Sequence, residues 1–295
     1  MNADSYFEIG HSHKVCEDYA LSGVQGDLAY AIVSDGCSSS KDSDVGARLL
    51  AHISRDALLY LHRRKLLYDP NFLESSFRAT FEEIVIKKCL EVKDTLRFPC
   101  DIFDATLLMT AVVGDTWKRK ILFSWGDGYF ILKRPSGAVD VISLSYESNA
   151  PYYLSYELSQ DKHDAYATEY GSVPLHKNID RISVDGVVDF VDVNVIPTVM
   201  QRSYFSVMGE GTDVTQIIVA SDGVGTYEDD TRIPIYPPGT EHMKYTALNV
   251  IPQIVSYKNP VGEFVTRRMN RLKKEYADTH VIHQDDVSCA AINLV

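Results

Sequence analysis

Apolar residues recur along the chain with two periods, one typical of strands and one typical of helices. Short apolar runs bounded by Gly, Pro or Asp are typical of buried strands. They lie at 28–34, 105–113, 120–125, 129–134, 138–144, 216–223 and 287–295. The four runs between 105 and 144 follow one another through short connections such as Gly126-Asp127-Gly128. Because consecutive strands joined by short turns usually pair, we expect these four to form an antiparallel meander.

Helical periodicity is strongest at 44–65, where apolar residues recur at spacings of three and four. This face consists of Val45, Leu49, Leu50, Ile53, Ala57, Leu58 and Leu61. We expect Ser43 or Asp44 to cap the helix, since a side-chain oxygen there can accept a backbone N–H bond. Asp69 as N-cap and Pro70 in the first turn predict a second helix, which should pack against the first as a helical hairpin.

The order of the elements favours layers rather than strand–helix alternation. Strands cluster along the chain, a helical pair follows the strand at 28–34, and a helix that opens at Asn259-Pro260 precedes the last strand. Residues 145–210 are rich in Tyr and lack sustained periodicity, so we expect a flap or insert there with a few short strands. No linker or repeat divides the chain. We therefore predict one domain over residues 1–295 with an α+β layered sandwich fold.

Charge and composition narrow the function. The chain has 41 acidic and 29 basic residues, a net charge of −12, which disfavours binding to nucleic acid or to anionic lipid. The sequence contains no run of about 18 apolar residues, as a membrane span would need, and its first ten residues lack the features of a signal peptide. We therefore expect a cytoplasmic protein without nucleic-acid or membrane partners, whose five cysteines are reduced thiols.

Carboxylates stand beside probable strands at four distant places. These are Glu17-Asp18, Asp35-Gly36, Asp222-Gly223 and Asp285-Asp286. Turn chemistry explains any single one, because Asp-Gly is a favoured turn pair. Four such places together would bring negative charge to one region, and this charge must be compensated. Carboxylate oxygens are ligands suited to Mg²⁺ or Mn²⁺.

The order of these motifs resembles that of the type 2C metal-dependent serine/threonine protein phosphatases. The shared order is ED, SDG before a long helix, ATxxxTAVV followed by a GD turn, a second SDG, and DDVS before the terminal strand. The resemblance covers the chain from Gly10 to the last strand. It implies a four-layer αββα sandwich, in which helices flank two mainly antiparallel sheets and two metal ions lie in a cleft at one end.

The resemblance also implies roles for individual residues. The implied ligands of the two Mg²⁺ or Mn²⁺ ions are Glu17, Asp18, Asp35, Gly36, Asp222 and Asp285. Asp35 would bridge both ions, the carbonyl of Gly36 would bind one of them, and Asp18 would act directly or through a bound water. Asp101 corresponds to the acid that holds a third, looser ion in some members, and a solvated loop acid is the equally expected alternative there.

Two positions depart from the family pattern. The Arg that holds the substrate phosphate, four residues before the Glu of ED, is replaced by His13. An imidazole grips phosphate less firmly than a bidentate guanidinium does. The His of Asp-Gly-His, which can protonate the leaving group, is replaced by Cys37. His13, at the phosphate, and Asp18, through its bound water, are the predicted catalytic residues.

These observations predict a phosphoserine and phosphothreonine protein phosphatase that uses a water activated by two metal ions. Its expected partners are phosphorylated protein substrates and a cognate serine/threonine kinase. Two alternatives stay open. A catalytically weak or inactive member used as a regulatory binding module is favoured by His13 and Cys37, and a hydrolase of small phosphomonoesters would use the same scaffold. The retained acids favour catalysis, because a module without metal has no evident reason to keep a repulsive cluster.

Overall fold

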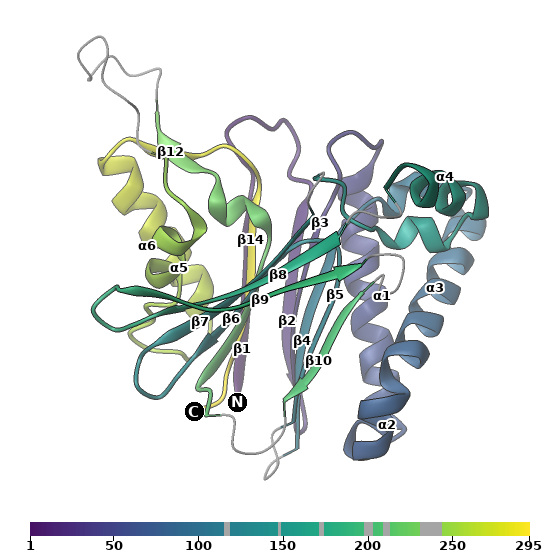
Figure 1. The fold of residues 1–295 in the computed structure, drawn as a ribbon, viewed down its shortest axis with the longest axis horizontal. Helices are drawn as coiled ribbons and strands as arrows, with labels where there is room; N and C mark the ends of the chain where they lie inside the picture. The colour runs from purple at the N-terminus through teal and green to yellow at the C-terminus, as the bar shows by residue number, and fades with distance from the viewer. Residues whose placement is uncertain (115–118, 147–148, 171–173, 198–202, 209–212, 231–243) are drawn as a thin grey trace.

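Two antiparallel β-sheets packed face to face form the centre of the molecule, with helices on both outer faces (Figure 1). The structure is a computed structural model that describes all residues except 115–118, 147–148, 171–173, 198–202, 209–212 and 231–243. The predicted α+β sandwich of two mainly antiparallel sheets is confirmed. The first and last strands pair with Asn2 opposite Asn293, so the two termini lie side by side.

The strands divide between one large and one smaller sheet. The seven-stranded sheet contains, in spatial order, β1 (Asn2–Glu8), β14 (Val287–Asn293), β11 (Gln216–Ala220), β6 (Gly128–Lys133), β7 (Val139–Tyr146), β8 (Pro174–Ile182) and β9 (Val188–Pro197). The five-stranded sheet contains β10 (Tyr204–Met208), β5 (Arg119–Trp125), β4 (Leu107–Val113), β3 (Leu28–Asp35) and β2 (Asp18–Gln25). A short separate pair consists of β12 (Tyr227–Asp229) and β13 (Val281–His283).

Helices cover the two outer faces. The helices of the described residues are α1 (Ser43–Arg63), α2 (Pro70–Ser75), α3 (Phe77–Leu96), α4 (Gln160–Tyr170), α5 (Ala247–Ile254) and α6 (Phe264–Asp278). Short 3₁₀ turns are η1 (Leu66–Tyr68), η2 (Cys100–Phe103), η3 (Leu154–Glu157) and η4 (Asp222–Gly225). The smaller sheet packs against α1, which pairs with α3 as the predicted hairpin, and the larger sheet packs against α6. None of the described helices combines the length and apolarity that a membrane span requires.

Apolar side chains fill the spaces between these layers. One core lies between the sheets and beneath α1 and α3, and includes the fully buried Phe81, Phe123 and Trp125. A second core lies beneath α5 and α6, where Phe264 and Met269 pack on the large sheet. Burial on both faces explains why β4 and β14, in which every residue is buried, are mostly apolar instead of alternating. The sandwich is thus held by burial of apolar surface on each side of each sheet.

The predicted meander is wrong at its centre. β4 pairs with β5 and β6 pairs with β7, but β5 and β6 belong to different sheets. The connection between them contains Gly126 and Gly128, whose φ angles are 84° and 130°. Such angles favour glycine, and they let the chain pass from one sheet to the other within a few residues. Sequence could not reveal this crossing, because strands buried on both faces look alike in either sheet.

Helix starts also differ from the expectation. The first helix has Asp42 as its N-cap, in the left-handed region and without a side-chain cap bond, so the predicted caps at Ser43 and Asp44 are wrong. The predicted cap at Asp69 is confirmed, because its side chain accepts a hydrogen bond from the backbone N–H of Asn71. The C-terminal helix begins at Phe264 rather than at Asn259-Pro260.

The region 145–210 contains more regular structure than expected. It holds η3, α4 and a long β8–β9 hairpin, in which strands of nine and ten residues extend the large sheet beyond β7. β10 then returns to the edge of the smaller sheet beside β5. The expected few short strands are therefore a long hairpin and one short strand. The extent of a flap and the single-domain boundary at 1–295 stay predictions.

The approach of α1 to η2 generates a stability prediction. A Cβ at Gly46 would lie 1.5 Å from the carbonyl oxygen of Ile102, so Gly46→Ala should force the helix outward. We expect a loss of about 1–3 kcal/mol in the free energy of unfolding, although alanine is the better helix former. Urea denaturation of the wild type and of Gly46→Ala measures this loss. Gly225→Ala is the control, because its nearest neighbour would lie at 3.5 Å. Equal losses in the two variants would contradict this packing.

Candidate metal centre

Four chain segments meet at one end of the sandwich. Asp18, the first residue of β2, lies opposite Asp35, the last residue of β3. β11 runs antiparallel to β14, so Asp222, which follows β11, and Asp285, which precedes β14, emerge at the same edge. Asp35 interacts electrostatically with all three of the other carboxylates. The fold thus brings together Asp18, Asp35, Asp222 and Asp285, as expected, although the segments that carry them lie up to about 270 positions apart along the chain.

A hydrogen bond between Ser221 and Asp18 joins the two sheets at this end. The hydroxyl of Ser221 donates to Asp18 Oδ2 at 2.7 Å, and the Ser221 backbone N–H donates to the carbonyl of Ser288 at 3.0 Å. The other oxygen, Asp18 Oδ1, is buried and has no hydrogen-bond donor among the described residues. A buried carboxylate oxygen without a donor is costly, and such atoms need an explanation. Asp18 Oδ1 therefore has a free ligand position.

Burial and like charge make the cluster repulsive at neutral pH. Burial raises the pKa of Asp18 to about 7, against the opposing effect of neighbouring serine hydroxyls. Burial, followed by the charges of Asp18 and Asp222, raises the pKa of Asp35 well above its usual range. Burial and then the charge of Asp285 raise the pKa of Asp222. Each shift means that the folded protein resists full ionisation of these carboxyls unless positive charge enters.

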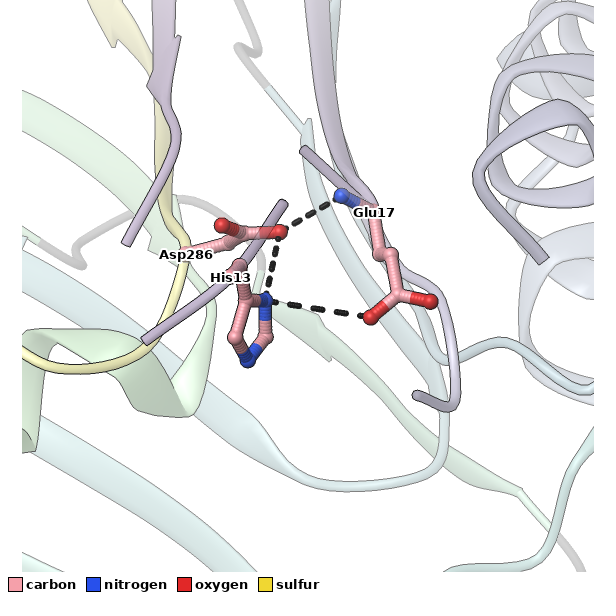
Figure 2. A group of neighbouring side chains, drawn as sticks. All are labelled: His13, Glu17 and Asp286. Atoms are coloured by element: carbon pink, nitrogen blue, oxygen red, sulfur yellow. Dashed lines mark hydrogen bonds and ion pairs between the residues drawn. The ribbon is translucent and has the colours of Figure 1, made fainter. Parts of the chain in front are cut away.

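A second group of side chains consists of His13, Glu17 and Asp286, which Figure 2 shows pointing toward one another. Asp286 accepts hydrogen bonds from two backbone N–H groups, that of Gly10 at 2.6 Å and that of Glu17 at 2.5 Å. Nδ1 of His13 lies 3.2 Å from Asp286 Oδ2 and 3.8 Å from Glu17 Oε2, and Nε2 lies 3.2 Å from Asp285 Oδ1. Burial lowers the pKa of His13, but contacts with these carboxylates raise it more. The neighbouring carboxylates therefore favour the protonated form of the imidazole.

Asp286 is the residue that sequence reasoning missed. Its side chain is 1% exposed, whereas that of the predicted Asp285 is 40% exposed. One ligand atom from each of His13, Glu17 and Asp286 lies within 4.8 Å of the others, so this group could also hold an ion. The adjacent pair Asp285-Asp286 was visible in the sequence, but nothing local showed which carboxylate turns inward.

Backbone contacts fix the loop that follows Asp35. The Gly36 N–H donates to the carbonyl of Glu17 at 3.2 Å, and the Thr106 N–H donates to the carbonyl of Asp35 at 2.8 Å. A Cβ at Gly36 would lie 2.9 Å from the backbone of Ser43, so only glycine fits without movement. Gly36 is thus clamped between β2 and the start of α1, which sets the position of its peptide beside the acids.

Two further acids behave differently from each other. Asp127 lies within electrostatic reach of Asp222, and burial followed by that charge raises the pKa of Asp127 to about 7. Asp101 lies on η2, where its carbonyl accepts the Asp104 N–H at 3.0 Å. Within the described parts of the chain, no contact joins the Asp101 side chain to the cluster. The structure therefore assembles the predicted residues except Asp101.

The residues present fit a hard divalent cation. Carboxylates with raised pKa values are stabilised when positive charge replaces their protons, and Asp18 Oδ1 offers an unused oxygen. The donors are oxygens apart from the imidazole of His13, which is the ligand chemistry of Mg²⁺ and Mn²⁺ rather than that of structural zinc. This match rests on the chemistry of the donors and on the burial of Asp18.

Comparisons with known proteins agree with this fold. The chain is similar in structure to a sex-determining protein of C. elegans, with 13% identity and a TM-score of 0.52, covering 98% of this chain and 64% of that one. It is also similar to the serine/threonine phosphatase Stp1 of Staphylococcus aureus, with 12% identity and a TM-score of 0.52 over 99% of this chain and 94% of that one. At these identities the similarity shows the fold. Comparison with curated protein sequences gives no significant match.

Sequence comparison extends beyond the fold. The model of the family described as protein phosphatase 2C matches residues 10–282, which is most of the chain. This range contains the ED motif and both SDG motifs, and the resemblance drawn from the order of the motifs is confirmed. The chain therefore belongs to the protein phosphatase 2C family, a family of protein serine/threonine phosphatases, and is classed with the phosphoric monoester hydrolases.

Proposed function

We propose that the chain removes phosphate from phosphoserine and phosphothreonine in proteins, using two Mg²⁺ or Mn²⁺ ions held at the acidic cluster. The convergence of Asp18, Asp35 and Asp222 from separate strand ends, in a buried place, is the observation that supports this most. A folded protein without a use for cations would gain stability by replacing such a cluster with apolar residues. Asp18 Oδ1 is buried and accepts no hydrogen bond within the described residues, which supports the same proposal.

The proposed ligands are the carboxylates and the single carbonyl that the family pattern implies. They are Glu17, Asp18, Asp35, the carbonyl of Gly36, Asp222 and Asp285. When bound, the ions supply charge compensation for the phosphate and lower the pKa of a water. A third ion at Asp101 stays a proposal without a supporting contact. The group of His13, Glu17 and Asp286 offers an alternative place for an additional ion.

The chain's own side chains orient the centre. Asp286 binds the backbone N–H of Glu17, and the hydroxyl of Ser43 donates to Glu17 Oε1 at 3.0 Å. These two bonds fix both ends of Glu17, so its second oxygen, Oε2, is turned toward His13. The carboxylate contacts of His13 raise its pKa, which favours the positively charged form of the ring. We propose that His13 contacts the substrate phosphate at the position where the family pattern has an Arg. Its imidazole would supply a single positive charge instead of the two-pronged contact of a guanidinium.

One observation favours the second candidate, a regulatory binding module with little or no activity. Three carboxylates already surround His13, so its positive charge is shared before any phosphate arrives. A weaker hold on phosphate would follow. A phosphoprotein substrate is part of the same proposal and is supported by family membership. A cognate kinase and a cytoplasmic location stay proposals.

The first prediction concerns metal dependence. Phosphate release from a phosphoserine peptide should occur with Mn²⁺ and fall to background when the ion is chelated, because the acids alone cannot offset the charge of the phosphate. Asp35→Ala is the matched inactive variant. Background release with Mn²⁺ present would favour the binding module, and release of phosphate only from small esters would favour a hydrolase of small phosphomonoesters.

A second prediction concerns Asp35 and stability. Without metal, Asp35→Ala should melt at a higher temperature than the wild type, because the substitution relieves like-charge repulsion. Mn²⁺ at a hundred times its Kd should stabilise the wild type by about 2.7 kcal/mol and leave the variant unchanged. Thermal melts with Mn²⁺ and with chelator measure both effects. The exposed Asp161→Ala is the control, and a variant at Asp35 that keeps the full metal effect would refute the ligand assignment.

A third prediction concerns pH. Because the pKa of Asp18 rises from 3.8 to about 7 on folding, the folded protein without metal keeps a proton that the unfolded chain releases. Stability from this group is complete below about pH 4 and is lost as the pH rises through 7, by an amount on the order of 4 kcal/mol. Urea titrations in chelator at several pH values should show this loss in the wild type and a smaller one in Asp18→Asn. If the free energies of unfolding of the wild type and of Asp18→Asn changed in parallel with pH, this prediction would be contradicted.

A further inference from the structure

A pocket lined by basic side chains lies between α6 and the loop that joins α5 to α6, on the outer side of the larger sheet (Figure 1). Its volume is about 310 Å³, at the lower end of the range for ligand-binding pockets. The rings of Tyr257 and Phe264, which form part of its lining, pack edge to face with centroids 4.9 Å apart. The basic and polar lining residues are Ser256, Lys258, Asn259, Arg267, Arg268 and Arg271. The pocket thus gathers positive charge on a chain whose net charge is −12.

Glu275 is the carboxylate partner of two of these arginines. Arg268 Nη1 lies 3.0 Å from Glu275 Oε2, and Arg271 Nε lies 2.7 Å from Oε1. The Arg268 side chain also donates to the carbonyl of Gln253 in α5 at 2.6 Å and is 12% exposed, so it joins the two helices. The Arg271 side chain is 58% exposed, and its Nη groups have no acceptor in the described parts of the chain. One carboxylate thus offsets two positive charges incompletely, and Arg271 retains donors for a ligand.

The other two basic side chains have no carboxylate partner among the residues that the structure describes. Arg267 donates to the backbone carbonyls of Asn259 and Val261 at 3.1 and 2.7 Å, so its guanidinium is held in place while its charge is not offset. Lys258 is exposed on the same loop. Like charges held close together repel one another, and an anion bound between them would relieve that repulsion.

The pocket is separate from the acidic cluster. Lys133, the last residue of β6, donates at 3.0 Å to the carbonyl of Val255, which immediately precedes Ser256. β6 begins at Gly128, next to Asp127 at the cluster. A strand of this length spans about 17 Å, so the pocket lies at the opposite end of β6 from the acids. It is therefore a second site and not an extension of the metal centre.

The donors that remain in the pocket suit a phosphorylated side chain. Such a group carries about two negative charges at pH 7 and three acceptor oxygens. A guanidinium can bind two of these oxygens at once, and an ammonium adds a further charge-assisted bond. The net charge of −12 disfavours nucleic acids and anionic membranes, which carry phosphate in long arrays. A single phosphate on a peptide meets the pocket without that repulsion.

We propose that this pocket binds a phosphorylated serine or threonine of a protein partner, away from the place where phosphate is removed. The pocket holds phosphoproteins near the metal centre of a phosphatase, and it is equally a recognition site for a binding module. This binding needs neither metal nor catalysis. The inference therefore goes beyond the proposed function and does not depend on it.

Titration calorimetry with metal-free protein tests the proposal. Protein freed of metal on a chelating resin keeps its acidic cluster negative, so that end repels phosphate, and binding that depends on phosphate reports another place. A phosphoserine peptide should bind about tenfold more tightly than the same peptide with glutamate or serine. Peptides that bind equally well, or binding of inorganic phosphate without binding of the phosphopeptide, would overturn the proposal.

Single substitutions locate the binding. Lys258→Gln and Arg271→Gln each remove one exposed positive charge from the pocket and should weaken binding of the phosphopeptide by about tenfold. Lys274→Gln is the matched control, because Lys274 is exposed on the same helix but does not line the pocket, and it should change the affinity little. Thermal melts that match the wild type show that the variants fold. Equal weakening in all three variants, or unchanged affinity in both pocket variants, would overturn the assignment.

The outcome for the pocket is separate from the outcome for the proposed function. A wild type that releases phosphate with Mn²⁺ but binds no phosphopeptide without metal would refute the pocket alone. A wild type that binds the phosphopeptide through the pocket but releases no phosphate with Mn²⁺ would refute the phosphatase reaction alone.

Discussion

The constraint on which the rest of the structure depends is the crowding of carboxylates at one end of the sandwich. Antiparallel pairing sets Asp18 against Asp35 across two neighbouring strands, and the β11–β14 pair brings Asp222 to the same end. The sheets cannot pack face to face without bringing these charges together. Apolar burial on every layer opposes the repulsion, and a divalent cation would remove it. The acidic end of the sandwich is therefore a place where like charge opposes the packing of the layers.

The surrounding contacts make sense as support for that crowded place. Ser221 joins the two sheets through Asp18, and Asp286 holds the segment that contains Glu17. Asp104 fixes the loop after Asp35 and the segment that contains η3 and α4 to each other. These polar bonds are directional and lie among buried groups, so they position side chains more accurately than apolar packing does. The departures at His13 and Cys37 are thus embedded in ordered surroundings.

Much of the fold could be predicted from local patterns, and the reasons for the failures are physical. Periodicity identified the first helix and the strands around residues 30, 110 and 290, because each buries a regular face. It could not assign β5 and β6 to different sheets, since strands buried on both faces carry no mark of their neighbours. β1 was missed because its residues, NADSYFE, are half-buried without alternation.

The candidate site was predictable to a similar extent. Acids at strand ends are visible in the sequence, and their order pointed to the family. Which of Asp285 and Asp286 turns inward depends on contacts with Gly10 and Glu17, far along the chain. Asp104 holds η3 and α4 beside the loop that follows Asp35, and no local pattern encodes those bonds. Tertiary contacts of this kind decide the roles of single residues after the motifs have fixed their neighbourhood.

Anomalous diffraction from crystals grown with Mn²⁺ would locate any ions bound at the acidic cluster. Paired manganese peaks are expected beside Asp35, contacted by Asp222 and by the carbonyl of Gly36. Peaks confined to other surfaces, or a crystal saturated with Mn²⁺ that shows none at the cluster, would contradict it.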